Sequence, residues 1–295
     1  MPLKLDQQTM RPFILLVKVA VLITIFLLLY FKFEDNEDLF LTIYSEVKLS
    51  FKQDFSLYVL VILLMFFNWS MEAIKWRYLI RSIFPITFWQ SFRGVISGLT
   101  LSFATPHGLG DYMGRVLSIH QTKKEPLIGA LFLGRTSQLL ATLLFGMVGL
   151  STLLGPVWIF YILIFIAISI IALFIALRKL EKVELLKPYL KLISQYNRIE
   201  LATVTFFSML RYLIFTGQFM IVLFIFLPEV SVFLSFSGGT YIFLAKSVLP
   251  TINFLSDLGI REYAAVTFFE KFNVPLVPTL SASLTLWILN ILIPT

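Results

Sequence analysis

Long apolar runs dominate the chain, and their lengths predict membrane-spanning helices. A helix needs about 20 mostly apolar residues to cross a bilayer. Runs of this kind cover residues 12–31, 55–74, 127–154, 158–177, 201–227 and 276–294, and less clear runs cover 86–105 and 232–249. We therefore predict an all-α polytopic membrane protein with about six transmembrane helices.

The positions of Lys and Arg predict how these helices are oriented, because cytoplasmic loops carry an excess of both. Lys75, Arg77, Arg81 and Arg93 follow the second run with no acid between them, so we place this segment in the cytoplasm and interpret Lys75 as a topology determinant. Residues 32–54 hold three basic and six acidic residues, which favours the outside. Both termini are then cytoplasmic.

The run 86–105 is predicted to start and end on the cytoplasmic side, since Lys123 and Lys124 follow it. It cannot be a single crossing, so we predict a re-entrant hairpin that is broken near Pro106 and Gly108. Broken backbone at membrane depth is tolerated only where protein or water satisfies its polar groups. The run 232–249 ends at Pro250 in the same way, which gives a second predicted hairpin.

An internal repeat relates the two hairpins. The first copy contains Pro106, Gly108, Gly110, Asp111 and Arg115, and the second contains Pro250, Asp257, Gly259, Arg261 and Glu262. Both the Asp and the Arg recur after 146 residues, as do the starts of the preceding runs at 55 and 201. The copies enter the membrane from opposite sides, so we predict an inverted repeat, which is a transporter design.

The chain is predicted to be a single integral membrane domain over residues 1–295. Residues 1–54 form an N-terminal anchor and an external loop, and residues 55–154 form repeat 1. Residues 155–200 form a linking span and a cytoplasmic amphipathic helix, and residues 201–295 form repeat 2.

Charged residues inside the apolar runs are the candidate functional residues, because a charge at the bilayer centre costs about 2.5–3.5 kcal/mol on insertion scales. The candidates for binding a lipid headgroup are Arg115, Arg261, Arg135 and Arg211, because the planar guanidinium binds phosphate bidentately. The candidates for orienting or pairing with them are Asp111, Asp257, Glu262 and Glu72. The hairpin backbone of Pro106, Gly108, Gly110, Pro250 and Gly259 could add N–H donors at helix starts.

A structural role is the alternative for each of these charges. Asp and Arg four residues apart share a helical face, so each pair could cap a helix and lock the fold. For Arg135 and Arg211, pairing with Glu72 or Asp111 explains the sequence as well as a headgroup role does.

Composition excludes most other classes of function. Hydrophobic residues make up 58% and charged residues 14% of the chain, against about 25% charge in soluble proteins. There is no Cys and there are two His, so we expect no metal site and no cofactor. The motifs of nucleophilic hydrolases, nucleotide-binding loops and zinc proteases are missing, so we expect no enzyme. The net charge of +7 favours anionic lipid, not nucleic acid, as the partner.

The two hairpin signatures resemble those of a known family. Besides the repeat residues above, the second signature includes Leu249, Ala264 and Ala265, and Arg135 also matches. Together they resemble the flippase-like transmembrane region of lysylphosphatidylglycerol synthases, the multiple peptide resistance factors among them. The resemblance implies a multi-pass protein of a bacterial cytoplasmic membrane that is associated with lipid translocation. Asn253 and Ser256 depart from the usual glycine-rich run, and the 295 residues hold no aminoacyl-transferase domain, so synthesis of the lipid is not implied.

We therefore expect a flippase-like lipid translocase that binds the headgroup of an anionic or glycosylated lipid. The predicted partner is a membrane phospholipid or glycolipid. One alternative is a non-transporting accessory protein for a membrane enzyme of lipid or cell-wall synthesis. The other is a secondary transporter of a small anion.

Overall fold

Helices form nearly all of the described structure. The computed structural model describes residues 37–105, 109–117, 119, 124–158, 160–161, 163–164, 195–248 and 254–294. Its main helices are α2 (Glu37–Gln53), α3 (Phe55–Ile80), α4 (Phe88–Ala104), α5 (Leu109–Tyr112), η3 (Met113–Leu117), α6 (Glu125–Leu154), α9 (Arg198–Phe226), α10 (Val232–Val248), α11 (Phe254–Glu270), α12 (Leu276–Trp287) and η4 (Ile288–Leu292). The predicted span 12–31, most of the span 158–177 and most of the surface helix within 155–200 lie outside the described residues.

Among the described residues, three helices are long and apolar enough to cross a membrane: α3, α6 and α9. They confirm the predicted runs at 55–74, 127–154 and 201–227, although α3 continues to Ile80 and so includes Lys75 and Arg77. Two shorter apolar helices, α10 and the continuous segment Leu276–Leu292, lie where the runs 232–249 and 276–294 were predicted. The chain is a multi-pass membrane protein.

The segment after α4 turns back and packs against it. Thr87 and Gln90 begin α4 with a capping box, in which each side chain accepts a hydrogen bond from the other residue's backbone N–H. After Thr105 the chain returns as α5 and η3, both of which contact α4. A Cβ on Gly114 would collide with the backbone of Gly98, so this close approach requires glycine. Residues 106–108, where the predicted hairpin breaks, lie outside the described residues, so the re-entrant hairpin stays a prediction.

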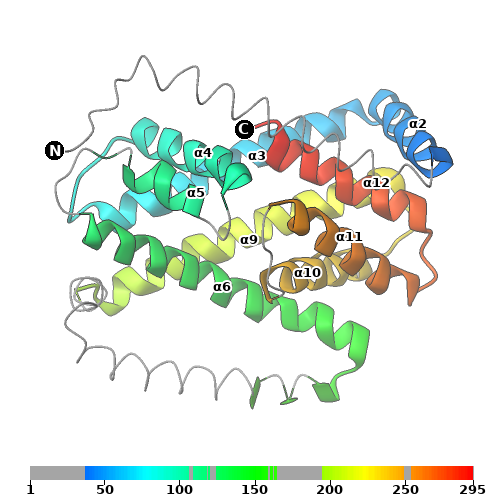
Figure 1. Ribbon diagram of the computed structural model, residues 1–295. Coiled ribbons are helices and arrows are strands. Elements are labelled where there is room, and N and C mark those ends of the chain that lie inside the picture. Colours follow the sequence, from blue (N-terminus) through cyan, green and yellow to red (C-terminus); the bar gives the residue numbers. More distant parts are fainter. Residues whose placement is uncertain are drawn as a thin grey trace.

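The helices surround α9, which runs through the middle of the molecule (Figure 1). In this view α4 and α5 lie on one side of α9, and α10 and α11 lie on the other. The most extensive helix contacts join α3 to α9 and α6 to α10, so both connect the two predicted repeats. α10 also packs against α11, as α4 packs against α5 and η3.

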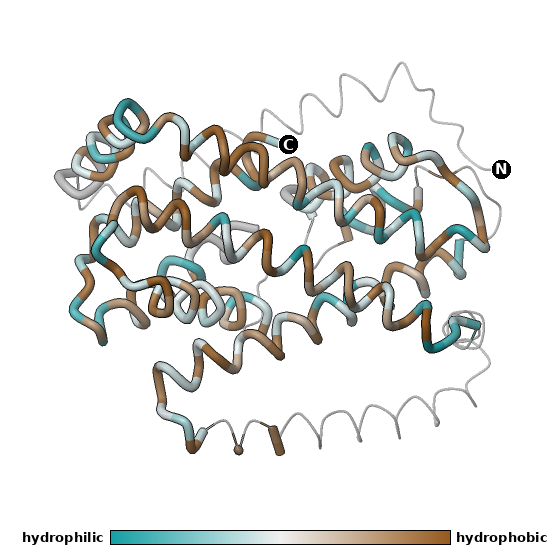
Figure 2. Tube along the Cα trace, turned by 180° about the vertical axis from the view of Figure 1, so that it is seen from behind, coloured by the Kyte–Doolittle hydropathy of each residue, from teal (hydrophilic) through white to brown (hydrophobic). Residues whose placement is uncertain are grey.

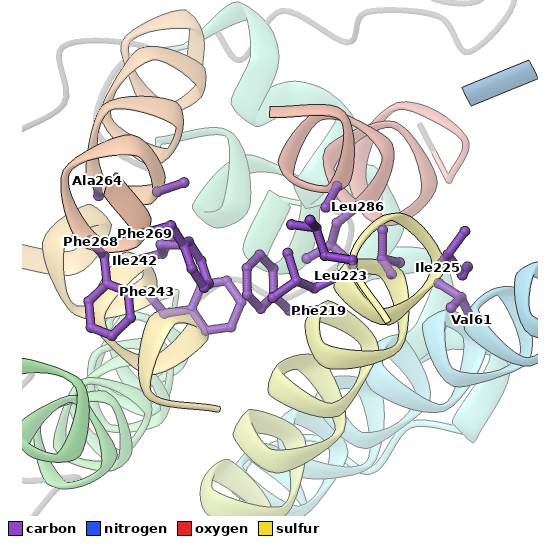
Figure 3. Close-up of a cluster of buried hydrophobic side chains, with 14 of the residues drawn as sticks. Val61, Phe219, Leu223, Ile225, Ile242, Phe243, Ala264, Phe268, Phe269 and Leu286 are labelled. Carbon is purple, nitrogen blue, oxygen red and sulfur yellow. The ribbon is translucent and has the colours of Figure 1, made fainter. Parts of the chain in front are cut away.

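Apolar side chains fill the interior and also cover much of the outside. Figure 3 shows the larger buried cluster, in which the rings of Phe219, Phe243, Phe268 and Phe269 lie at one end and Leu223, Leu286 and Val61 extend it toward α12 and α3. Figure 2 shows apolar residues along most of the length of the long helices. Exposed apolar residues such as Phe66 and Phe67 on α3 suit a surface that faces lipid tails.

Helix α2 differs from the sequence prediction, which assigned residues 1–54 to an anchor and an external loop. Residues 37–53 are helical, and α2 packs against α12. Ile43 and Ser50 are buried, and the Glu46 carboxylate accepts a hydrogen bond from Ser281 at 3.0 Å. The charge of this segment led to the loop assignment, but Lys48 and Lys52 are exposed on an amphipathic helix, whereas Ile43 and Ser50 are buried and Glu46 faces α12.

Candidate functional site

The centre of the candidate site is Glu72, in the second half of α3. Glu72 and Lys75 are three residues apart, so they lie on one helical face. Both are buried, with 6% and 2% of their surface exposed. The Lys75 Nζ lies 2.8 Å from Glu72 Oε2 and 3.3 Å from the carbonyl oxygen of Gly134. The Lys75 side chain, which we interpreted as a topology determinant, is therefore buried in the interior.

Arg115 joins Glu72 from η3, where the helix widens into a π-turn. Its Nη1 donates to Glu72 Oε1 at 2.7 Å, and its Nε forms an ion pair with Asp111, four residues earlier. Asp111 and Arg115, which the sequence places on one helical face, therefore form an ion pair. The Arg115 guanidinium also lies 5.8 Å from the ring centre of Trp76, a distance at which a cation and a ring attract.

Arg211 and Arg135 complete the group from α9 and α6. The Arg211 Nη1 lies 3.1 Å from Glu72 Oε2, and its guanidinium lies 5.2 Å from the ring centre of Trp69. Arg135 donates from both Nε and Nη2 to Asp111 Oδ2, at 3.2 and 2.8 Å. The pairing with Glu72 or Asp111 that the sequence allowed for these two residues is therefore observed.

We call these side chains the ionic cluster: Glu72, Lys75, Asp111, Arg115, Arg135 and Arg211. Two carboxylates face four cationic groups in it, so its formal charge is +2. Both carboxylates are already engaged by more than one base. Guanidinium groups donate charge-assisted hydrogen bonds to anions, so the cluster is suited to bind an anionic group.

The ionic cluster also contacts polar residues that the sequence analysis had not indicated. Gln138 accepts from Arg211 Nη1 at 3.3 Å and donates to the Ser208 carbonyl at 3.4 Å. The Ser208 hydroxyl lies 3.4 Å from Lys75 Nζ. No spacing in the sequence could have shown these contacts, because they join α3, α6 and α9. The proximity of Lys75 to Glu72 was visible as an i, i+3 pair.

The second copy of the signature forms a different set of contacts. Arg261 is 1% exposed, and its Nη2 donates to the Ser283 carbonyl on α12 at 2.9 Å. The Ser283 hydroxyl in turn donates to Glu262 Oε1 at 3.0 Å. Arg115 and Arg261 are both buried, but the partners recorded for them are on different helices. The side chain of Asp257 lies outside the described structure.

The predicted backbone positions are only partly described. Gly110 is buried against α4, where a Cβ would meet the backbone of Leu101 and Ser102. For Gly259, no described atom outside its own helical turn lies within 4 Å of the place where a Cβ would be. Pro106, Gly108 and Pro250 lie outside the described residues. Within the part of the chain that the structure describes, no three His, Asp or Glu side chains are grouped as metal ligands.

Comparison with known proteins places the chain in a family. The model of the family described as "Lysylphosphatidylglycerol synthase TM region" matches residues 15–295. No curated protein and no solved structure matches the chain. The match agrees with the resemblance found at the two signatures and extends it over nearly all of the 295 residues.

Proposed function

This chain belongs to the family of lysylphosphatidylglycerol synthase TM regions, which is linked to lipid flipping, and from this premise we propose that it binds and translocates a polar lipid. The headgroup, anionic or glycosylated, meets the ionic cluster, while the acyl chains stay in the bilayer. The protein acts as a carrier and makes or breaks no covalent bond in the lipid.

The observation that carries this proposal is the gathering of four cationic side chains around two carboxylates inside the membrane domain. Lys75 and Arg115 are almost fully buried there, and charged side chains at such positions are rare and usually functional. A phosphate that enters the cluster would accept charge-assisted hydrogen bonds from guanidinium groups. The site thus provides a polar stopping point for a headgroup on its way between leaflets.

The proposed movement uses the two halves of the chain as an inverted repeat with two re-entrant hairpins. Two features support it. Helices α3 and α9, which begin each half, start at Phe55 and Arg198, which are 143 residues apart, close to the 146 residues that separate the Asp and the Arg of the two signatures. In each half the following helix also packs against the next segment, α4 against α5 and η3, and α10 against α11. Alternate opening of the two hairpins would expose the headgroup to one leaflet and then to the other.

A non-transporting accessory protein is the second candidate function. The contacts of Arg115 favour it, because two carboxylates already engage this guanidinium. In this role the cluster would only hold α3, η3, α6 and α9 together, and no lipid would move.

Headgroup translocation in proteoliposomes separates the two candidates. We expect the purified protein to move fluorescent phosphatidylglycerol between leaflets faster than empty liposomes do. Arg211→Gln, which removes one charge of the cluster but keeps a side chain that can donate, should slow this by about tenfold or more. Arg198→Gln, at the exposed start of α9, is the matched control and should keep the wild-type rate. Wild-type rates no higher than those of empty liposomes would favour the accessory role.

A further inference from the structure

The corner where α3 ends and α4 begins is held in place by hydrogen bonds from side chains to the backbone. The Ser91 hydroxyl, on the inner face of α4, donates to the carbonyl oxygen of Ala73 on α3 at 2.6 Å. The Arg77 Nε donates to the carbonyl oxygen of Ile86, just before α4 begins, at 3.0 Å. With the capping box described above, these bonds fix the first turns of α4 on α3, so the side chains on its outer face have a defined place.

An exposed tryptophan lies on the first turn of α4, within a group of three aromatic rings. The ring centre of Trp89 is 5.4 Å from that of Phe88 and 6.1 Å from that of Phe92. Phe88 and Phe92 pack against the smaller buried cluster, whereas Trp89 is 66% exposed. A tryptophan placed in this way is typical of the level where hydrocarbon meets lipid headgroups.

The same corner is basic. Residues 73–110 contain four Lys or Arg residues and no Asp or Glu. Lys75 belongs to the ionic cluster, and Arg81 forms a surface ion pair with the start of α9. The other two, Arg77 and Arg93, are exposed, and within the described residues neither forms an ion pair. The corner thus presents cationic charge that a partner outside the protein could meet.

Arg93 and Trp89 lie on one face of α4, since four residues separate them. Both side chains are exposed. The sequence analysis places this end of the molecule in the cytoplasm, and the cytoplasmic leaflet carries anionic lipids that attract basic residues close to its surface. A guanidinium beside a tryptophan at headgroup level matches a lipid phosphate above its acyl chains.

We propose that Trp89 and Arg93, with Arg77 beside them, form a binding site for an anionic phospholipid of the cytoplasmic leaflet. The Arg93 guanidinium binds the phosphate, and the Trp89 ring lies against the upper part of the acyl chains. This lipid is the one that is passed on to the ionic cluster. That loading role rests on the proposed function, and it specifies both a phosphate-bearing substrate and the leaflet from which it is taken.

Helix α4 connects the corner to the ionic cluster. A Cβ on Gly98 would lie 2.8 Å from Asp111 Oδ1 and 3.0 Å from Asp111 Cα, so the inner face of α4 meets the cluster at this residue. Gly98 is five residues after Arg93, which corresponds to about 8 Å along the helix axis and about 140° around it. A lipid held at Arg93 is therefore separated from the ionic cluster by α4 itself, and a shift of α4 would join the two.

Fluorescence quenching in nanodiscs measures which lipid occupies the corner. The chain has no native cysteine, so Ser97→Cys carries a single bimane label at an exposed position one turn beyond Arg93. The nanodiscs consist of phosphatidylcholine with a small fraction of nitroxide-labelled lipid, either phosphatidylglycerol or phosphatidylcholine, labelled on the acyl chain. At equal content we expect labelled phosphatidylglycerol to be enriched at the bimane about fivefold over labelled phosphatidylcholine.

Three variants separate a binding site from general surface charge. Arg93→Gln should lose most of the preference for phosphatidylglycerol. Arg93→Lys keeps the charge, and with it the topology signal, but loses the planar fork, so it should keep only part of the preference. Arg198→Gln removes an exposed charge at the start of α9 and should keep all of it. Excess soluble glycerol phosphate, added at constant ionic strength, should leave the preference unchanged.

Each other result would overturn a stated part of the proposal. Equal quenching by the two lipids in the wild type would remove the site, and this outcome needs no variant to fold. An equal loss in Arg93→Gln and Arg198→Gln would assign the preference to the net charge of this end of the molecule. Loss of the preference on addition of glycerol phosphate would replace the lipid with a soluble phosphate.

Translocation in the same membranes tests the loading role separately. Arg93→Gln should slow translocation when phosphatidylglycerol is scarce and approach the wild-type rate when it is abundant, because a loading site acts on substrate capture. Equal rates when the lipid is scarce would overturn the loading role. Preferential quenching in a protein that moves no lipid would retain the site and end the proposed function.

Discussion

Glu72 is the residue on which the ionic cluster depends most. Its two oxygens contact three bases, Lys75 at 2.8 Å, Arg115 at 2.7 Å and Arg211 at 3.1 Å. These bases come from α3, η3 and α9, so one carboxylate holds three elements together. Burial makes each of these contacts strong, and it makes the loss of the carboxylate costly, because the bases would remain without compensation.

We predict that Glu72→Gln destabilises the protein by about 3–5 kcal/mol, the range found when one partner of a buried ion pair is removed. The formal charge of the ionic cluster would rise from +2 to +3. Thermal unfolding in detergent, followed by circular dichroism, measures the effect.

A second substitution tests whether charge is the cause. Glu72→Gln combined with Lys75→Met returns the formal charge to +2 and replaces one buried cation with an apolar side chain of similar length, so it should recover part of the lost stability. Glu200→Gln is the matched control, because Glu200 pairs with Arg81 at the surface and its loss should change the melting temperature far less. If the double variant is less stable than Glu72→Gln alone, geometry and not charge excess governs the cluster.

At the scale of elements, the close packing of η3 against α4 positions Arg115. A side chain on Gly114 would collide with the backbone of Gly98, so the two segments can approach only because both residues lack a Cβ. We predict that Gly114→Ala destabilises the protein by about 1–3 kcal/mol through overpacking. The shift of η3 should also weaken the contact of Arg115 with Glu72.

Gly217→Ala provides the matched comparison for that variant. Among the described residues outside its own helical turn, no atom lies within 4 Å of the place where a Cβ at Gly217, in the middle of α9, would be. The substitution should leave stability unchanged or raise it by up to about 1 kcal/mol, because alanine favours helix more than glycine does. Chemical or thermal unfolding of the two variants side by side measures the difference. Equal stability of the two variants would mean that α4 and η3 can separate at little cost.

The sequence predicted the long helices well, because an apolar run of about 20 residues has few other structures available to it. Both boundaries of the predicted runs 127–154 and 201–227 lie within three residues of the boundaries of α6 and α9. Helix α2 was missed because its acids and lysines resembled a loop. Leu39, Ile43 and Val47 recur every four residues in it, and this period was the signal for an amphipathic helix.

The candidate site was predictable only where its partners are close in sequence. The i, i+4 spacing gave the contact between Asp111 and Arg115, and the apolar context identified Glu72, Arg135 and Arg211 as unusual. The sequence could not show that Glu72 contacts Arg115, which lies 43 residues further along the chain, because that contact depends on how η3 folds against α3. We interpreted Lys75 as a determinant of membrane topology because it follows the predicted end of the span at residue 74. Helix α3 instead continues to Ile80 and so includes Lys75.

At the scale of the whole molecule, the contact between α6 and α10 joins the two halves of the chain. Gly149 on α6 lets the backbones of the two helices approach, since a Cβ there would collide with the backbone of Ser237 and Tyr241. One turn further along, the Thr152 and Ser237 hydroxyls are 3.2 Å apart. Both side chains are short, so cysteines at these positions would have their Cβ atoms near disulfide distance.

If lipid movement requires one half to move against the other, a covalent link between α6 and α10 should stop it. The chain has no native cysteine, so the double variant Thr152→Cys and Ser237→Cys contains a single possible intramolecular disulfide. We predict that the oxidised protein still binds phosphatidylglycerol but translocates it at least about tenfold more slowly, and that a reductant restores the rate. Each single-cysteine variant, treated in the same way, should translocate as the wild type does. Unchanged translocation by the fully oxidised double variant would instead place the moving boundary elsewhere, with α6 and α10 as one rigid unit and the hairpin of α4, α5 and η3 as the element that opens.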